Sequence, residues 1–217
     1  MNTPLRNLLT VCVLSTGLAS LAWADGQPVL TKPIPKTPMA CGVYGLTVEP
    51  AARVPLKVEP LTKAAFAPYG DVIEPASASK TYPINNGETM RYHDMAAIQA
   101  NGSNARPIVS IFESKPVRGS INVHLLERHP YGSQAFVPLD GQTFLVVVAA
   151  PGDKLDPSTI KAFITDGKQG VNYHAGVWHH PVLTLGKTTN YLIIDRSGDE
   201  PNCQEIGMPK TYMLGRY

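Results

Sequence analysis

Three histidines crowd the segment QGVNYHAGVWHHP, residues 169–181, and they are half of the six histidines in the chain. Histidine serves both in acid–base catalysis near neutral pH and as a metal ligand. The spacing of His174, His179 and His180 differs from the helical HExxH signature of zinc proteases. These side chains could therefore be metal ligands, an acid–base pair or packed core residues, and the backbone that carries them must decide.

A second candidate group follows the strand-like run INVHLLERH, residues 121–129. Side chains alternate between the two faces of a strand. The odd-numbered positions of the run are Ile121, Val123, Leu125, Glu127 and His129. If the apolar members point into the core, Glu127 and His129 point there as well. An inward charge is costly unless it is paired or functional, so this end of the strand is a candidate site.

The same alternation sorts the other polar residues. Gln134 shares a face with Phe136. His179 shares a face with Val177, whereas the adjacent His180 lies on the opposite face. At most one member of the histidine pair is therefore expected in a site, and the other belongs to the scaffold.

The elements that would position these residues are short strands. The chain has twenty prolines and eighteen glycines, which favour many turns over long helices. Strand-like runs follow one another at residues 106–114, 121–128, 134–139, 143–150, 160–165, 170–176, 180–185 and 190–195. An Asn-Gly turn in YPINNGETMRYHD predicts a hairpin, and Thr62 is a plausible cap of a short helix. We expect a mainly all-β sandwich or barrel with a few short helices.

Two spacings resemble those of cupins, whose metal ligands come from an HxH motif with a later Glu and from a P-x-G-x-x-H motif. Glu127, His129 and Gln134, with Gly141 beyond them, follow the first spacing with Glu and Gln substituted at two positions. His174 to His179 follows the second spacing with His in place of Pro. This resemblance implies a jelly-roll barrel, also called a double-stranded β-helix, with four polar groups at its ligand positions: Glu127, His129, Gln134 and His179.

Several segments, in order, are similar to the ureidoglycolate lyase family. They are KVEPLTKAAFAPYGDVIEP, YPINNGETMRYHD, RPIVSIF, LLERHPYGSQAFVPL, FLVVVAAPGD, QGVNYHAGVWHHP and LIIDRSG, within residues 56–206. The resemblance implies a cupin-like homodimer that cleaves (S)-ureidoglycolate to glyoxylate and urea in allantoin degradation, part of purine metabolism. It also implies nickel as a cofactor. The chemistry itself requires no metal, so a divalent ion held by Glu127, His129, Gln134 and His179 stays open.

Ureidoglycolate carries a hydroxyl, a carboxylate and a urea nitrogen on one carbon. Its cleavage needs a base for the hydroxyl proton and an acid for the departing nitrogen. We expect His129, His179 and Glu127 to supply these roles, without assigning which histidine is the acid. The expected substrate-binding residues are Arg91, His93, Asn85, Arg106, Gln134 and His174. Arg106 could equally be a solvated surface residue, and Asn85 could be part of a turn.

The chain divides into expected regions that bear on compartment. Residues 1–24 read as a signal peptide, because a basic start, an apolar run and small residues before Asp25 follow in order. A Pro-rich arm is expected at 25–54, the lyase-like domain at 55–207 and a tail at 208–217. We therefore expect an exported protein, periplasmic or secreted. A cytoplasmic protein would follow if the leader were a misjudged start of translation, and a buried N-terminal helix is a further alternative.

Composition narrows the partners. A formal net charge of +2 without a Lys/Arg run argues against nucleic acid. The apolar run of the leader is shorter than the roughly 20 residues needed for a stable membrane anchor. An oxidising compartment would permit a bridge between Cys41 and Cys203, which the sequence leaves undecided. The expected partner is a small-molecule substrate. The alternative function is an exported cupin that acts on, or only binds, a related ureido or hydroxy acid.

Overall fold

A computed structural model describes residues 20–24, 27–31, 39–41 and 52–215 of the chain, which separate into two units, Met1–Pro33 and Ile34–Tyr217. In the first unit, β1 (Ser20–Ala24) pairs antiparallel with β2 (Gln27–Thr31). Most of the expected signal peptide, at residues 1–24, lies outside the described residues. No helix among the described residues is long and apolar enough to cross a membrane.

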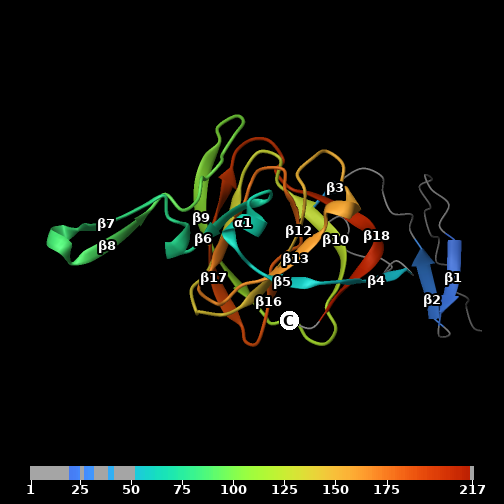
Figure 1. Ribbon diagram of the computed structural model, residues 1–217. Coiled ribbons are helices and arrows are strands. Elements are labelled where there is room, and N and C mark those ends of the chain that lie inside the picture. The colour runs from blue at the N-terminus through green and yellow to red at the C-terminus, as the bar shows by residue number, and fades with distance from the viewer. Residues whose placement is uncertain (1–19, 25–26, 32–38, 42–51, 216–217) are drawn as a thin grey trace, which may run out of the picture. The chain divides into compact units, whose positions relative to one another are not determined.

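The second unit is built on two sheets (Figure 1). The nine-stranded sheet has the order β3 (Met39–Ala40), β18 (Gln204–Leu214), β10 (Asn122–Arg128), β15 (Trp178–His179), β12 (Phe144–Ala149), β13 (Lys161–Ile164) and β5 (Val58–Pro60), with β16 (Leu183–Thr184) on β12 and β4 (Arg53–Leu56) on β18. The five-stranded sheet has the order β6 (Gly70–Ile73), β14 (Gly170–Tyr173), β11 (Gln134–Pro138), β17 (Thr189–Ser197) and β9 (Arg106–Ser114). Most neighbouring strands are antiparallel. The exceptions are β5, which pairs in parallel with β13, and β4, which pairs in parallel with β18.

Helices are few and short. They are α1 (Lys63–Phe66) and three 3-10 turns, Pro75–Ser77, Asn85–Gly87 and Pro157–Thr159. The Thr62 side chain accepts a hydrogen bond from the Ala65 N–H at 3.2 Å, so it caps α1 as expected. The predicted all-β, cupin-like barrel with a few short helices is therefore confirmed.

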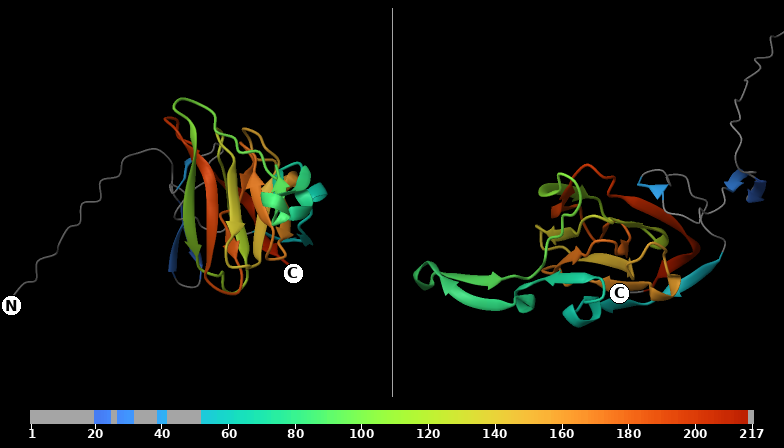
Figure 2. Two further views of the ribbon diagram at one scale, coloured as in Figure 1. Left: turned by 90° about the vertical axis from the view of Figure 1, so that its left-hand side faces the viewer. Right: turned by 90° about the horizontal axis from the view of Figure 1, so that it is seen from above.

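The core between the two sheets is rich in aromatic residues. The five-stranded sheet contributes Phe136, Tyr173 and Tyr191, and the nine-stranded sheet contributes Phe144 and Phe163. Rings meet edge to face, for example Phe144 and Tyr191 with centroids 5.3 Å apart, a preferred aromatic geometry. Both sheets therefore bury one face in a common interior (Figure 2).

The opposite face of the nine-stranded sheet carries a second cluster of buried side chains, which includes Val123, Leu126 and Trp178. The expectation that Val123 shares a face with Glu127 is therefore wrong. The register of β10 on β18 shifts between Val123 and Leu125, and such an irregularity breaks the alternation of faces. Beyond it the alternation resumes, since Arg128 stacks its guanidinium over Trp178 at 4.9 Å, on the face away from Glu127.

A hairpin of β7 (Lys80–Ile84) and β8 (Thr89–His93) projects from the sheets of the second unit (Figures 1 and 2). Its turn uses Asn85 and Asn86 at φ of 51° and 56° and Gly87 at 92°, conformations that Asn and Gly tolerate best. The hairpin predicted from the Asn-Gly pair is confirmed.

Both ends of the expected domain contain regular structure. The region expected as an arm, residues 25–54, includes β2 and β3, and β4 starts at Arg53. The region expected as a tail, residues 208–217, includes much of β18, which runs to Leu214. Met208 is fully buried in that strand. Much of the region expected as a tail therefore belongs to a strand of the nine-stranded sheet.

Candidate active site

Glu127 and His179 form a cross-strand pair inside the barrel. They lie directly opposite each other on β10 and β15, an arrangement that brings the two Cβ atoms close together. The His179 Nε2 atom lies 3.5 Å from the Glu127 Oε1 atom, and the side chains are 1% and 15% exposed. The antiparallel pairing of two strands therefore creates a buried imidazole–carboxylate pair.

His129 follows β10 and joins this pair, with its ring centroid 5.2 Å from that of His179. Its Nδ1 atom lies 2.6 Å from the backbone oxygen of Asn202. Because a carbonyl can only accept, Nδ1 carries the proton and Nε2 holds a free lone pair. The Nε2 atom is buried without a hydrogen-bond partner within the described part of the chain. Such an atom needs an explanation, and a substrate or a metal ion would supply one.

The turn between His174 and His179 is fastened to the other half of the site. The Gly176 N–H donates to the backbone oxygen of His129 at 2.9 Å. Gly176 has a φ of 79°, a conformation that glycine adopts without strain. The glycine of the second cupin spacing therefore places His179 relative to His129.

His179 is held on three sides. Its Nδ1–H donates to the Val177 carbonyl at 3.1 Å, which turns Nε2 toward Glu127. The Gln134 Oε1 atom lies 3.2 Å from that Nε2 atom. The ring stacks on Tyr173 with centroids 4.2 Å apart and planes 10° apart. A side chain fixed by these contacts offers Nε2 in one direction, as a catalytic or metal-binding group requires.

The electrostatic environment gives Glu127 and His129 different charges at neutral pH. Burial raises the pKa of the Glu127 carboxyl, but its interaction with His179 and the charges of the neighbouring histidines outweigh this, so the net pKa is below the ordinary value. Burial, together with the charge of His179, lowers the pKa of His129. Glu127 is therefore a carboxylate and His129 a neutral imidazole at neutral pH.

The same three residues could hold a metal ion. Glu127, His129 and His179 each offer a ligand atom, and these atoms lie within 4.8 Å of one another. Two imidazoles and a carboxylate suit borderline divalent metals. The free lone pair on His129 Nε2 fits such an ion, and the Gln134 amide adjoins the group. The site residues are thus compatible with a metal.

The other two histidines of residues 169–181, His174 and His180, have hydrogen-bond partners outside the group of Glu127, His129 and His179. His180 hydrogen-bonds through Nδ1 to the Pro181 oxygen at 2.8 Å. His174 places Nε2 3.0 Å from Asp71 Oδ2 and lines a cleft of about 310 Å³ with Asp71, Asp94 and Lys63. His129, His179 and Glu127 are not among the residues that line that cleft. The role of His174 in binding substrate stays a prediction.

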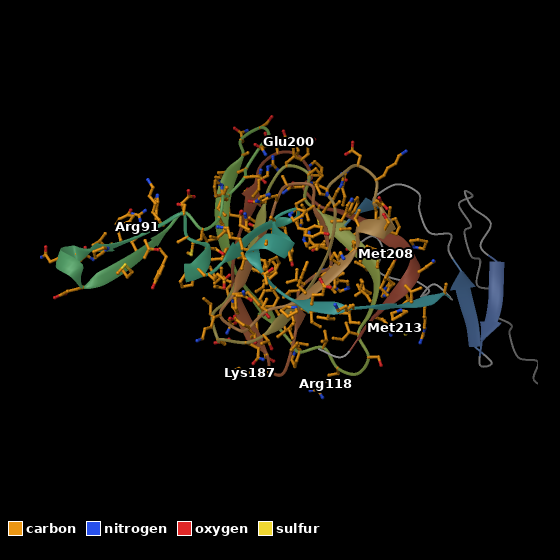
Figure 3. All side chains as sticks on the ribbon, viewed as in Figure 1. Arg91, Arg118, Lys187, Glu200, Met208 and Met213 are labelled. Carbon is orange, nitrogen blue, oxygen red and sulfur yellow. A yellow bond between two sulfur atoms is a disulfide. The ribbon has the colours of Figure 1, made fainter. Side chains whose placement is uncertain are left out.

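Four predicted substrate-binding residues lie away from the barrel interior. Asn85, Arg91 and His93 belong to the projecting hairpin, where Arg91 stacks on Tyr82 at 5.9 Å (Figure 3). Arg106 is exposed at the start of β9. Of the expected substrate contacts, the structure brings Gln134 to the Glu127 group, and the hairpin residues and Arg106 stay predictions.

The sequence did not point to several residues that shape the site. Tyr173 supports His179, and Asn202 sets the tautomer of His129. The alternation of strand faces gave no sign of Asn202, because this residue lies in a loop after β17. Cys41 and Cys203, left undecided before, form a disulfide whose Cα atoms are 5.4 Å apart. Its two sulfurs lie 3.9 and 4.0 Å from Glu127 Oε2.

A barrel of short, mostly antiparallel strands, with two inward imidazoles and a carboxylate, defines a cupin-like fold with an enzyme-like site. The comparison with known families agrees. The profile of the family described as "Ureidoglycolate lyase" matches residues 53–215, which is most of the chain. The chain belongs to the ureidoglycolate lyase family.

Similar proteins carry the same name. A ureidoglycolate lyase of Pseudomonas aeruginosa strain LESB58 is 54% identical over 150 residues, covering 69% of this chain and 88% of that protein. A ureidoglycolate lyase of Burkholderia mallei strain NCTC 10229 is 52% identical over 159 residues, covering 73% and 92%. One from Pseudomonas entomophila is 50% identical over 159 residues, covering 73% and 95%.

Asp71 gives a stability prediction. Burial raises its pKa, but hydrogen bonds from Asn172, His174 and the Ala97 N–H outweigh this and lower the net value. A lowered folded-state pKa stabilises the protein above the ordinary value of about 4, and the contribution is lost as the pH falls through the folded value. Asp71→Asn should therefore reduce the free energy of unfolding at pH 6 more than at pH 3.5.

Urea unfolding at the two pH values measures this difference. The control is Asp153→Asn, because the Asp153 side chain is 99% exposed and an exposed ion pair contributes little. Equal losses for Asp71→Asn at both pH values would contradict the role given to its hydrogen bonds.

Proposed function

We propose that this protein cleaves (S)-ureidoglycolate to glyoxylate and urea. The family and the names of its relatives support this substrate. The single observation that carries the chemistry is the convergence of His129, His179 and Glu127 inside the barrel, with both Nδ1 atoms committed to carbonyls. The relatives' names give no support to the alternative of a binding protein or an enzyme for a related acid.

The reaction moves one proton off the substrate and one onto the leaving group. As the hydroxyl loses its proton, its oxygen forms the carbonyl of glyoxylate, and the carbon–nitrogen bond breaks with its electrons passing to nitrogen. That nitrogen gains a proton and leaves as urea. A base and an acid within reach of one carbon atom are thus sufficient, each contributing about 10²–10⁴-fold.

The tautomers of the two histidines indicate which of them acts as the base and which as the acid. His129, neutral with a free Nε2 lone pair, is placed to take the hydroxyl proton. His179 in its protonated form carries a proton on Nε2, facing Glu127, and can donate it to the departing nitrogen. Glu127 stabilises that protonated imidazole. The burial of the group keeps bulk water from competing for either proton.

A divalent metal ion also fits these residues. Glu127, His129 and His179 would hold it, with the Gln134 amide beside them. Family resemblance suggests nickel, and borderline metals suit such donors. When bound, the ion would act as a Lewis acid on a substrate oxygen.

We further propose that the protein is a homodimer. The outward face of β9, at the edge of its sheet, exposes Val109 by 68% and Ile111 by 56%. Apolar side chains side by side on an exposed edge strand are prone to pair with another chain. Phe112, on the other face of the same strand, contacts Phe136 with ring centroids 6.0 Å apart and is itself 39% exposed.

We propose export as the setting of this activity. The signal-like pattern of residues 1–24 supports it. The disulfide between Cys41 and Cys203 supports it independently, because such bonds persist in oxidising compartments.

Replacing either catalytic histidine tests the proposed function. His129→Ala and His179→Ala should each lower turnover of ureidoglycolate about 10²–10⁴-fold, because each removes a proton-transfer group. Glyoxylate, urea and ammonia are measured together. His180→Gln is the matched control and should keep turnover near that of the unchanged protein. Release of ammonia in place of urea, or full activity of the two alanine variants, would refute the assignment.

Metal content separates the two forms of the mechanism. Protein purified without chelator should contain a stoichiometric divalent ion by mass spectrometry, and Glu127→Gln should reduce that content, because it removes the charged ligand. A metal-free protein whose turnover is unaffected by chelator would contradict the metal proposal and leave the acid–base proposal standing.

The dimer is tested by Ile111→Asp, which places a charge on the exposed apolar strand. Sedimentation velocity should show the unchanged chain at twice the monomer mass and the variant as a monomer, because burying an unpaired charge opposes association. Arg118→Asp, a charge change in a loop before β10, is the control. An unchanged mass for Ile111→Asp would exclude this face as the interface.

Export is tested on protein expressed in a bacterium with its leader. The mature form should be recovered from the cell envelope or medium, with Asp25 as its first residue by mass spectrometry. Recovery of the intact chain in the cytoplasm would refute export.

A further inference from the structure

The Cys41–Cys203 disulfide joins the active site to a segment outside the family region. Cys41 follows β3, and Cys203 immediately precedes β18. The two strands pair through Ala40 with Gln204. The family match begins at residue 53, so the cross-link is a feature that the family assignment does not account for.

The bond covers one side of the Glu127 carboxylate. Oε1 faces His179 at 3.5 Å, whereas Oε2 lies 3.9 Å from the sulfur of Cys41 and 4.0 Å from that of Cys203. A disulfide sulfur carries no proton, so neither contact is a hydrogen bond. The sulfurs therefore occupy space beside Oε2 without competing with His179 for the negative charge, and they limit rotation of the carboxylate.

The residue before the bond acts on the second catalytic group. The backbone oxygen of Asn202 accepts from His129 Nδ1 at 2.6 Å, and its side-chain oxygen accepts from the Tyr131 N–H at 2.7 Å. Asn202 is adjacent to Cys203 in the chain, so the covalent anchor of Cys203 also restrains the carbonyl that sets the His129 tautomer. One bond thus restrains the environment of Glu127 and of His129.

We propose that the Cys41–Cys203 disulfide is a positioning element of the active site, which holds Glu127 toward His179 and His129 in its Nδ1–H tautomer. This inference rests on the proposed function for its effect on turnover. A dithiol can reverse the arrangement. One thiolate of the reductant attacks a sulfur, its second thiol displaces the mixed disulfide, and the reductant leaves as a cyclic disulfide. Two electrons and two protons pass to the protein, which then carries two thiols no longer held at bonding distance.

A cross-link that served only stability would behave differently. It would change the free energy of unfolding and leave the reacting groups as they are. A positioning role instead lowers kcat with little change in KM, because the misplaced groups act on the bound substrate. It also changes the proton distribution on the His129 ring, which can be observed without any substrate.

The test uses protein expressed in an oxidising compartment, with Cys41→Ala/Cys203→Ala as the variant that cannot form the bond. Kinetics on ureidoglycolate and nitrogen-15 spectra of the histidine rings are recorded before and after treatment with dithiothreitol. His129→Ala identifies the His129 signals. Ile160→Ala controls for general loss of stability, since Ile160 packs in the second cluster of buried side chains, on the face of the nine-stranded sheet opposite the common interior. The double variant treated with dithiothreitol controls for effects of the reductant.

We expect reduction, or the double substitution, to lower kcat about 10- to 100-fold and to shift the His129 ring nitrogens away from the Nδ1–H form. Ile160→Ala should lower the melting temperature alone. The proposal is overturned if the two cysteines are free thiols in the isolated protein, or if their loss lowers the melting temperature with kcat and the His129 spectrum unchanged. If no form cleaves ureidoglycolate while the His129 spectrum responds to reduction, the proposed function fails and the positioning role stands.

Discussion

The pairing of β10 with β15 places Glu127 directly opposite His179, and the site depends on this single cross-strand contact. A buried carboxylate is costly unless a partner offsets the loss of water. Here the partner is an imidazole fixed by the Val177 carbonyl and by stacking on Tyr173. The two sheets in turn bury their aromatic residues around this pair, so the barrel interior and the chemistry share the same strands.

His129 completes the group through a loop, which makes its position depend on more distant contacts. The carbonyl that orients it belongs to Asn202, and its own carbonyl accepts the Gly176 N–H. These two hydrogen bonds join segments that are far apart in the sequence. Strand pairing alone can position a side chain. A loop residue needs partners on both sides to be positioned equally precisely.

Much of this arrangement could be predicted from the sequence. Alternation along short strands separated His179 from His180 and Glu127 from Arg128, and the structure keeps both separations. The same rule failed for Val123, because the register shift before Leu125 cannot be read from residue types. Asn202 and Tyr173 escaped notice for a related reason, since their roles arise from contacts between segments remote in the chain. The hairpin was predicted from Asn-Gly, but its projection from the sheets follows from tertiary structure.

The disulfide has a topological consequence as well. Its two cysteines are 162 residues apart, so the covalent ring that they close includes both halves of the site and the projecting hairpin. An exposed hairpin is a segment that proteases reach readily. A single cut there would open the ring into two fragments that remain joined through sulfur. Such a cut would leave Glu127, His129 and His179 together on the C-terminal fragment, which the disulfide still ties to the N-terminal one.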